Sequence, residues 1–183
     1  MALDALDTGF ALRLGEQTIL THSPDAPCFF LGRGVPHVHS KLGHFDLAQE
    51  VIERIALGHV EVDGDVVRFA ESAGAPWLLE ATVSGDPDDA VIALKALDPA
   101  LNRLWLRVPA EAGEHVWGGG EQFSYFDLRG RHFPLWSSEP GVGRDPASPL
   151  FQQVEAHRKG GGGGYAHTNY PQPTFVSSRR YAL

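Results

Sequence analysis

One segment of the chain, residues 118–144, concentrates the side chains that could take part in chemistry. It reads GGGEQFSYFDLRGRHFPLWSSEPGVGR and mixes glycines, aromatic rings and charged groups without a helical or strand period. Loops of this composition let the backbone approach a ligand closely, and they present ring faces and a few directed polar groups. The segment is therefore typical of a sugar-binding rim rather than of a core strand.

Carboxylates matter most here, because retaining glycosidases use two of them, a nucleophile and an acid/base, about 5–5.5 Å apart. The candidates are Glu121, Asp127, Glu139 and Asp145, and the sequence does not show that any two of them meet in space. Glu139 differs from the other three because Pro140 and Gly141 follow it and fix a turn that would direct its side chain.

The remaining charged residues of the segment have a simpler interpretation as groups that position the loop. Asp127 has Arg129 and Arg131 close by in sequence, and an Asp127–arginine pair would fix the loop. We assign loop positioning to Glu121, Asp127 and Arg129. The aromatic rings either stack on sugar rings or are buried to fasten the loop, and both roles remain open; these rings are Tyr125, Phe126, Phe133 and Trp136.

Other motifs give weaker signals. His37, His39 and His44 lack a carboxylate or cysteine at metal-ligand spacing, so we interpret them as surface or hydrogen-bonded histidines and predict no metal site. The run Gly118–Gly120 lacks the Lys-Ser/Thr of a phosphate-binding loop, so it should let the backbone bend sharply beneath a ligand or against a neighbouring domain. Cys28 is expected to be a small buried hydrophobe.

The rest of the sequence predicts an all-β fold, an antiparallel β-sandwich. Alternating residues 10–14 and 18–21 flank the turn at 15–17, and residues 59–62 and 65–69 flank Asp63-Gly64, a strong tight-turn signal. Further strands are expected at 77–83, 90–97 and 101–108. Residues 45–57 have helical spacing within a β pattern, so helix and strand both remain open.

Length and composition predict one domain over residues 1–183, with core strands in 1–112 and a loop-rich closing part in 113–183. Gly160–Gly164 should form a mobile loop. The net charge of -8 argues against nucleic acid and anionic membranes as partners. A single cysteine, no leader and no apolar run of about 20 residues favour a cytoplasmic protein.

Several strings of the loop-rich part resemble a known family. Gly-Glu-Gln at 120–122, the stretches 124–130, 133–136 and 141–144, Glu139, and Pro171–Ser177 are similar to the N-terminal domain of glycoside hydrolase family 31 enzymes, and within that family to the sulfoquinovosidases. The resemblance implies a galactose-mutarotase-like β-sandwich that packs on a (β/α)8 barrel and gives it an active-site loop. The barrel would follow residue 183.

The same resemblance implies how the function is divided. Both catalytic aspartates of the family lie on the barrel, so no catalytic residue is assigned to this chain, and no cofactor is needed. Glu139 matches an acidic residue that touches a sugar hydroxyl, and Arg144 and Trp136 are further substrate-binding candidates. The whole enzyme would hydrolyse α-sulfoquinovosides to sulfoquinovose. An α-glucosidase or α-xylosidase, a stand-alone carbohydrate-binding sandwich and a structural interaction domain are the alternatives.

Overall fold

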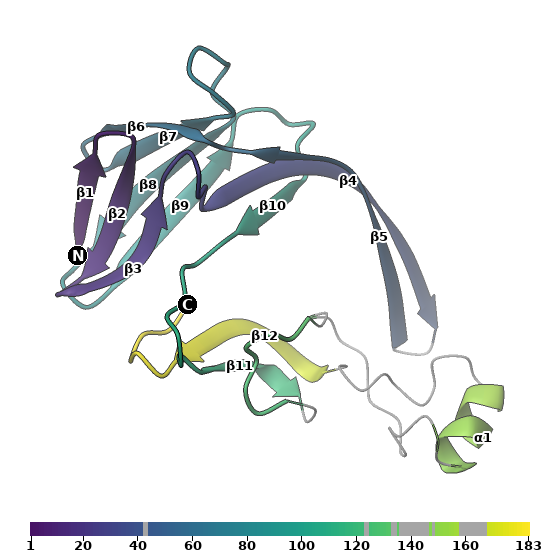
Figure 1. The fold of residues 1–183 in the computed structure, drawn as a ribbon. Helices are drawn as coiled ribbons and strands as arrows, with labels where there is room; N and C mark the ends of the chain where they lie inside the picture. The colour runs from purple at the N-terminus through teal and green to yellow at the C-terminus, as the bar shows by residue number, and fades with distance from the viewer. Residues whose placement is uncertain (42–43, 123–124, 133–134, 136–146, 148, 158–167) are drawn as a thin grey trace. The chain divides into compact units, whose positions relative to one another are not determined.

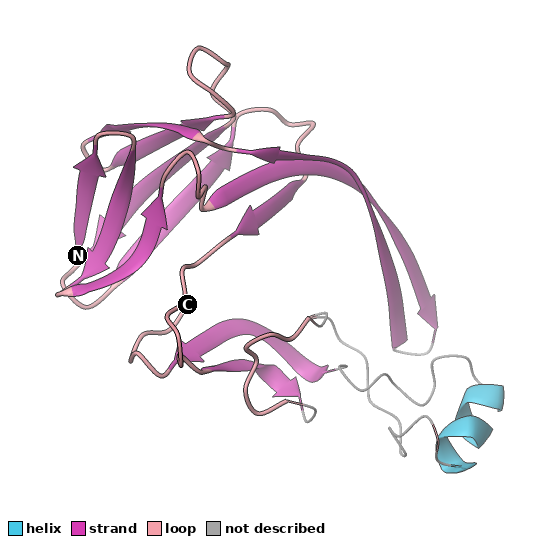
Figure 2. Ribbon diagram, in the orientation of Figure 1, coloured by secondary structure: helices cyan, strands magenta, loops and turns pink. Residues whose placement is uncertain are grey.

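The computed structural model describes residues 1–41, 44–122, 125–132, 135, 147, 149–157 and 168–183. These residues form two compact units, one of Met1–Val35 and Gln49–Ala110, the other of Pro36–Ala48 and Glu111–Leu183. Strands make up most of the regular structure in both units (Figures 1 and 2). The expected all-β, antiparallel fold is confirmed, and Gly160–Gly164 lies outside the described residues.

The strands of the first unit form three antiparallel sheets. β1 (Ala2–Leu6), β2 (Gly9–Leu14) and β3 (Gln17–His22) form one sheet in chain order. A second has the order β6 (His59–Asp63), β7 (Val66–Ala70), β8 (Leu79–Gly85) and β9 (Ala90–Ala96). The third has the order β10 (Arg103–Leu106), β4 (Phe29–Lys41) and β5 (His44–Ala56), and the far ends of β4 and β5 belong to the second unit.

Both expected hairpins are present. Leu14 pairs with Gln17 across the first turn, and Asp63 pairs with Val66 across the second. The second tight turn is therefore Gly64-Asp65, one residue later than the expected Asp63-Gly64. Gly64 carries the positive φ of 59° that such a turn needs, so Asp63 is free to stay in the strand.

The open choice for residues 45–57 is resolved as strand, because β5 spans His44–Ala56 beside β4. Pairing with a neighbouring strand outweighs the helical spacing of its apolar residues. An ion pair links the two strands, with Arg33 Nε 2.8 Å from Glu53 Oε2. A helix appears instead at α1 (Pro149–His157), in the part that we expected to be loop-rich. Its sequence signal is Ser148-Pro149, a frequent helix start.

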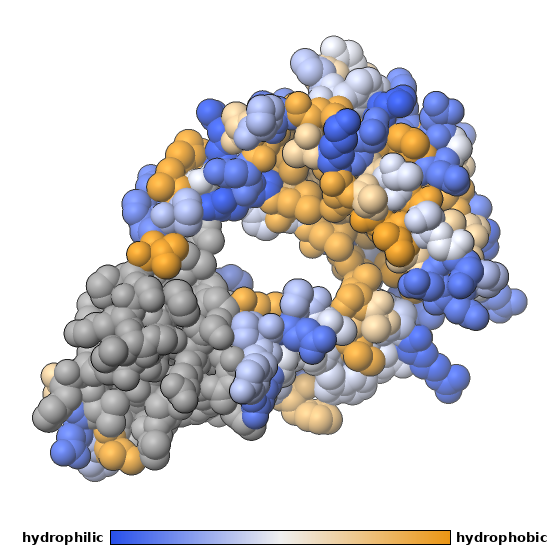
Figure 3. Space-filling view, turned by 180° about the vertical axis from the view of Figure 1, so that it is seen from behind, coloured by the Kyte–Doolittle hydropathy of each residue, from blue (hydrophilic) through white to orange (hydrophobic). Residues whose placement is uncertain are grey.

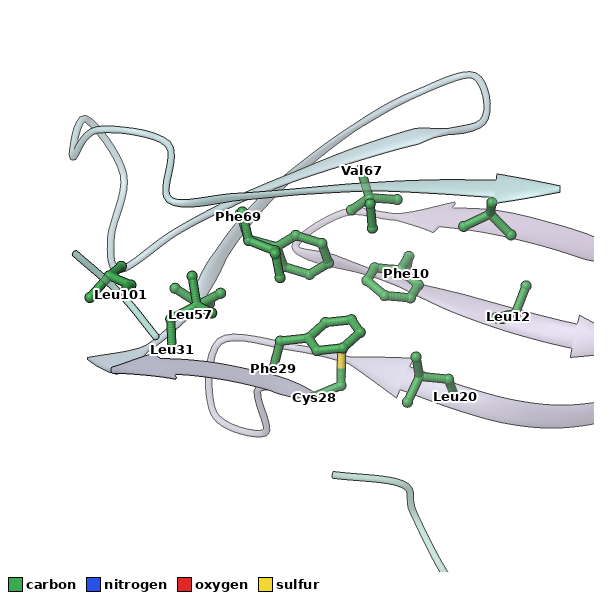
Figure 4. Packing of buried hydrophobic residues seen from close by; sticks show 13 residues of the cluster. Phe10, Leu12, Leu20, Cys28, Phe29, Leu31, Leu57, Val67, Phe69 and Leu101 are labelled. Atoms are coloured by element: carbon green, nitrogen blue, oxygen red, sulfur yellow. The ribbon is translucent and has the colours of Figure 1, made fainter. Parts of the chain in front are cut away.

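The hydrophobic core belongs to the first unit. Figure 4 shows the rings of Phe10, Phe29 and Phe69 between the strand layers, surrounded by aliphatic side chains. The Phe69 ring meets those of Phe29 and Phe10 edge-on, at centroid distances of 5.3 and 6.0 Å. Cys28 lies in the same cluster, and burial raises its pKa to about 12, so its interpretation as a buried hydrophobe is confirmed.

Apolar side chains also lie on the surface of the first unit (Figure 3). Leu104 and Leu106 of β10 pair with Leu31 and Phe29, so they lie on the face of the sheet that carries the core. They nevertheless remain 45% and 47% exposed. The core face thus continues to an uncovered edge at β10. Within the described parts of the chain, no helix has the length and hydrophobicity of a membrane span.

One titratable group lies inside the aromatic cluster. The ring of His22 stacks on Phe10 at 5.6 Å and is 2% exposed. Its Nδ1 accepts a hydrogen bond from the amide of Cys28 at 3.3 Å. Burial lowers the pKa of His22, although the backbone of Gly58 acts in the opposite direction. His22 is therefore neutral in the native protein at neutral pH.

We predict that His22 makes the protein less stable as the pH falls below about 6.5, the ordinary histidine pKa. The unfolded chain then binds a proton that the native state does not, so the free energy of unfolding falls by up to about 1.4 kcal/mol per pH unit. Urea denaturation between pH 7.5 and 5.5 should show a flatter pH dependence for His22→Phe than for the wild type. The exposed His132→Gln is the control, and equal slopes for His22→Phe and the wild type would contradict the prediction.

Candidate functional site

The structure places only part of the predicted site. Trp136, Glu139 and Arg144, the three substrate-binding candidates, lie outside the described residues, as do Phe133 and Asp145. The loop-positioning candidates Glu121, Asp127 and Arg129 are described, and all three belong to the second unit. Their surroundings show how the start of the predicted rim is held.

The glycine run lies in strand β11 (Val116–Gln122), which pairs antiparallel with β12 (Thr168–Ser177). The register shifts between Gly118 and Gly120 and again between Gly120 and Gln122. Gly118 and Gly120 have φ values of 124° and 90°, and a Cβ on either would collide with a backbone carbonyl of β12. The two glycines thus let the backbone of β11 approach the partner strand β12 closely.

Asp127 connects the turn at residues 127–131 to the start of β11 through its carboxylate. Its Oδ2 lies 2.6 Å from Nδ1 of His115, and its Oδ1 accepts hydrogen bonds from the amides of Arg129 at 3.1 Å and Val116 at 3.3 Å. The hydrogen bond with His115, aided by these amides, lowers the pKa of Asp127 to about 2. The carboxylate is therefore ionised at neutral pH.

The prediction that Asp127 pairs with a neighbouring arginine is wrong, because its carboxylate bonds His115 instead. The guanidinium of Arg129 instead donates from Nη1 to the carbonyl oxygens of Glu111 at 3.1 Å and Glu114 at 3.0 Å. The guanidinium of Arg131 lies over the ring of Tyr125, 4.7 Å from its centroid. Arg129 Nη1 thus donates to two carbonyls of one turn, while Asp127 accepts from its own backbone two residues on, as aspartates in turns do.

A buried carboxylate that the sequence did not flag lies beside this turn. Glu114 is 5% exposed. Its Oε1 accepts hydrogen bonds from Ser177 Oγ at 2.5 Å and Tyr181 OH at 2.8 Å, and its Oε2 accepts one from the Glu111 amide at 2.9 Å. We call Glu111, Glu114, Arg129, Ser177 and Tyr181 the Glu114 clamp.

The electrostatics of the clamp keep Glu114 charged. Burial alone would raise the pKa of Glu114, but the hydrogen bonds from Ser177, Glu111 and Tyr181, with Arg179 nearby, outweigh it and lower the pKa. Burial and the bond to Glu114 raise the pKa of Tyr181. Glu114 and Asp127 both hold their charge with several donors, so neither is poised to act as a proton donor near neutral pH.

The two described aromatic rings of the segment differ in their surroundings. The guanidinium of Arg131 lies over the face of the Tyr125 ring, a contact that suits a ring that fastens the loop. Phe126 is 87% exposed, and its ring is tilted against Trp117 at 6.2 Å. Glu121, the third loop-positioning candidate, is exposed on β11.

The histidine candidates do not form a metal site among the described residues. In this part of the chain, no three histidine, cysteine or acidic side chains lie close enough together to hold a metal ion, and His37 is exposed.

Comparisons with known proteins find relatives that match all or nearly all of the chain. No protein-family model matches the chain. A sulfoquinovosidase of Agrobacterium fabrum is 51% identical over 183 residues, which are 100% of this chain and 27% of that protein. A sulfoquinovosidase of Escherichia coli is 40% identical over 178 residues, which are 94% of this chain and 26% of that protein.

A solved structure is also similar. It is a sulfoquinovosidase of glycoside hydrolase family 31 from E. rectale, in complex with an aza-sugar inhibitor. Its TM-score is 0.85 at 38% identity, over 100% of this chain and 27% of that chain.

The resemblance to the sulfoquinovosidases of family 31 is confirmed. It extends beyond the loop-rich part that first showed it, because the matches include the core strands of the first unit. The expected antiparallel sandwich agrees with the solved family 31 structure. The chain spans about a quarter of the length of these glycoside hydrolases.

We predict that Glu114→Gln lowers the melting temperature of the chain. A glutamine offers only one acceptor oxygen, so donors on the two sides of Glu114 cannot all be satisfied, and an unmet buried group is costly. We expect a fall of roughly 5 °C in differential scanning calorimetry. Glu16→Gln, which changes an exposed carboxylate in the β2–β3 turn, should shift the melting temperature very little. Equal melting temperatures for Glu114→Gln and the wild type would contradict a stabilising clamp.

Proposed function

We propose that this chain is the N-terminal, carbohydrate-contacting domain of a retaining α-glycosidase that hydrolyses α-sulfoquinovosides to sulfoquinovose. The observation that carries the proposal is 51% identity across the whole chain to a sulfoquinovosidase that is much longer. The rim segment 118–144 supports it, because its composition suits contact with a sugar. In this account the chain supplies substrate contacts and the downstream part supplies the chemistry.

In the proposed enzyme, the catalytic residues and the substrate contacts of this chain lie on different domains. Two aspartates of a downstream (β/α)8 barrel act as nucleophile and acid/base, and they need no cofactor. This chain, as a galactose-mutarotase-like sandwich, holds its rim loop at the pocket. Glu139 accepts a hydrogen bond from a sugar hydroxyl, while Arg144 and Trp136 contact the substrate. The charged, fully hydrogen-bonded states of Asp127 and Glu114 support roles for both in holding the loop.

The uncovered apolar edge of the first unit supports a larger protein. Leu104 and Leu106 extend the core face of the β10 sheet into solvent, and a larger apolar patch that included them would mark an interface. A downstream domain would cover it. The same arrangement disfavours a stand-alone carbohydrate-binding module, which would bury its own core face.

The 183-residue chain alone should not hydrolyse α-glycosides, because both catalytic aspartates of the proposed enzyme lie downstream. Their removal forfeits most of a rate enhancement that is typically at least about 10⁶-fold. The assay is release of 4-nitrophenol from 4-nitrophenyl α-sulfoquinovoside by the chain and by the full-length protein. Turnover by the isolated chain at enzyme-like rates would overturn the division of labour. Cleavage of the α-glucoside or α-xyloside in preference to the sulfoquinovoside by the full-length protein would overturn the specificity.

In the full-length enzyme, Glu139→Gln should lower kcat/KM by about 10- to 100-fold. A charge-assisted hydrogen bond that the substrate buries is worth roughly 1.5–3 kcal/mol, and glutamine keeps the shape but loses the charge. The melting temperature should hardly move, since a loop carboxylate at a pocket rim stabilises little of the fold. Glu16→Gln, an exposed carboxylate in the β2–β3 turn, is the matched control. An unchanged kcat/KM together with a clearly lower melting temperature would instead make Glu139 a structural anchor.

A further inference from the structure

Three stretches of the second unit meet around Glu114, whose carboxylate bonds one of them and whose backbone carbonyl bonds another. They are residues 111–116, 127–131 and 177–181. Charged carboxylates are seldom buried unless partners satisfy them, and Glu114 has donors on both of its oxygens. Satisfied buried polar groups of this kind fix one arrangement of the segments that they join. The clamp is therefore a device for holding these stretches in register.

The first connection runs from residues 111–116 to the end of β12. Ser177 Oγ and Tyr181 OH both donate to Glu114 Oε1. Beside them, the Ser178 amide donates to the carbonyl of His115 at 2.9 Å, and the His115 amide donates to Ser178 Oγ at 3.0 Å. The turn that carries Tyr181 is closed by the Ser177 amide, which donates to the Tyr181 carbonyl at 2.8 Å.

The second connection runs from residues 111–116 to residues 127–131. The guanidinium of Arg129 holds the carbonyls of Glu111 and Glu114, and Asp127 holds the amide of Val116. The amide of Leu128 donates to the Val116 carbonyl at 2.8 Å. One short stretch of chain, residues 111–116, thus binds both other stretches.

The position of these stretches in the sequence gives the clamp a use. Residues 127–131 come shortly before Glu139, and residues 177–181 come shortly before the point at which the proposed catalytic part begins. We propose that Glu114 is a positioning residue of the glycosidase, whose clamp sets the start of the Glu139 loop relative to the strand that leads into the barrel. This inference rests on the proposed function. It adds Glu114 as a residue that affects substrate binding only through Glu139.

A double-mutant cycle in the full-length enzyme tests the inference. Glu114→Gln, Glu139→Gln and the double variant are assayed with 4-nitrophenyl α-sulfoquinovoside. We expect Glu114→Gln to lower kcat/KM by about 10-fold, because small misplacements of a substrate contact are costly. In the Glu139→Gln background the same change should lower kcat/KM by no more than about 2-fold, since the contact that it positions has already been lost.

The outcomes separate the inference from the proposed function. If Glu139→Gln impairs the enzyme and the two effects multiply, Glu114 acts on stability alone and the positioning role is overturned. If Glu139→Gln leaves kcat/KM unchanged, the role of Glu139 in the proposed function fails, and the inference fails with it. Non-multiplying losses support both.

Two further variants keep the test decisive if Glu114→Gln does not fold. Tyr181→Phe removes one donor to Glu114 and keeps the ring, and Ser177→Ala removes the other side-chain donor. Each should show a smaller loss of kcat/KM that disappears in the Glu139→Gln background. Losses of equal size in both backgrounds would overturn the proposal. Glu16→Gln, in the β2–β3 turn of the first unit, should leave both kinetics and coupling unchanged.

Discussion

A buried, charged carboxylate needs donors on both oxygens, and the second unit is organised around this requirement at Glu114. Leu128 is the one buried apolar side chain among the described residues of this unit. A backbone amide, a serine and a tyrosine donate hydrogen bonds that hold the Glu114 carboxylate. Such bonds are directional, so they hold a loop in one geometry more strictly than apolar contact does.

The first unit is stabilised mainly by apolar packing. Its sheets close on a cluster of aromatic and aliphatic side chains, with Phe29 and Phe69 almost fully excluded from solvent. This packing supplies stability without directed polar groups. An apolar cluster thus dominates the first unit, whereas the described residues around Glu114 in the second unit are joined mainly by hydrogen bonds.

Local patterns in the sequence predicted the hairpins, because alternation and turn residues act over a few positions. They left residues 45–57 undecided, since pairing with β4 and not propensity makes them a strand. They also assigned Asp127 to the nearest arginines rather than to His115. Glu114 escaped notice because its side-chain partners, Ser177 and Tyr181, lie 63 and 67 positions away, and no local spacing signals such a contact.

The central claim is that this chain presents Glu139 to a sugar bound by a downstream catalytic domain. The most direct measurement is a crystal structure of the full-length enzyme with a sulfoquinovose-like inhibitor. The account predicts a Glu139 carboxylate oxygen at hydrogen-bonding distance from a sugar hydroxyl, about 2.5–3.0 Å, with Glu114 still bound to Ser177 and Tyr181. A Glu139 side chain directed away from the bound sugar, with no residue of this chain in contact with it, would contradict the account.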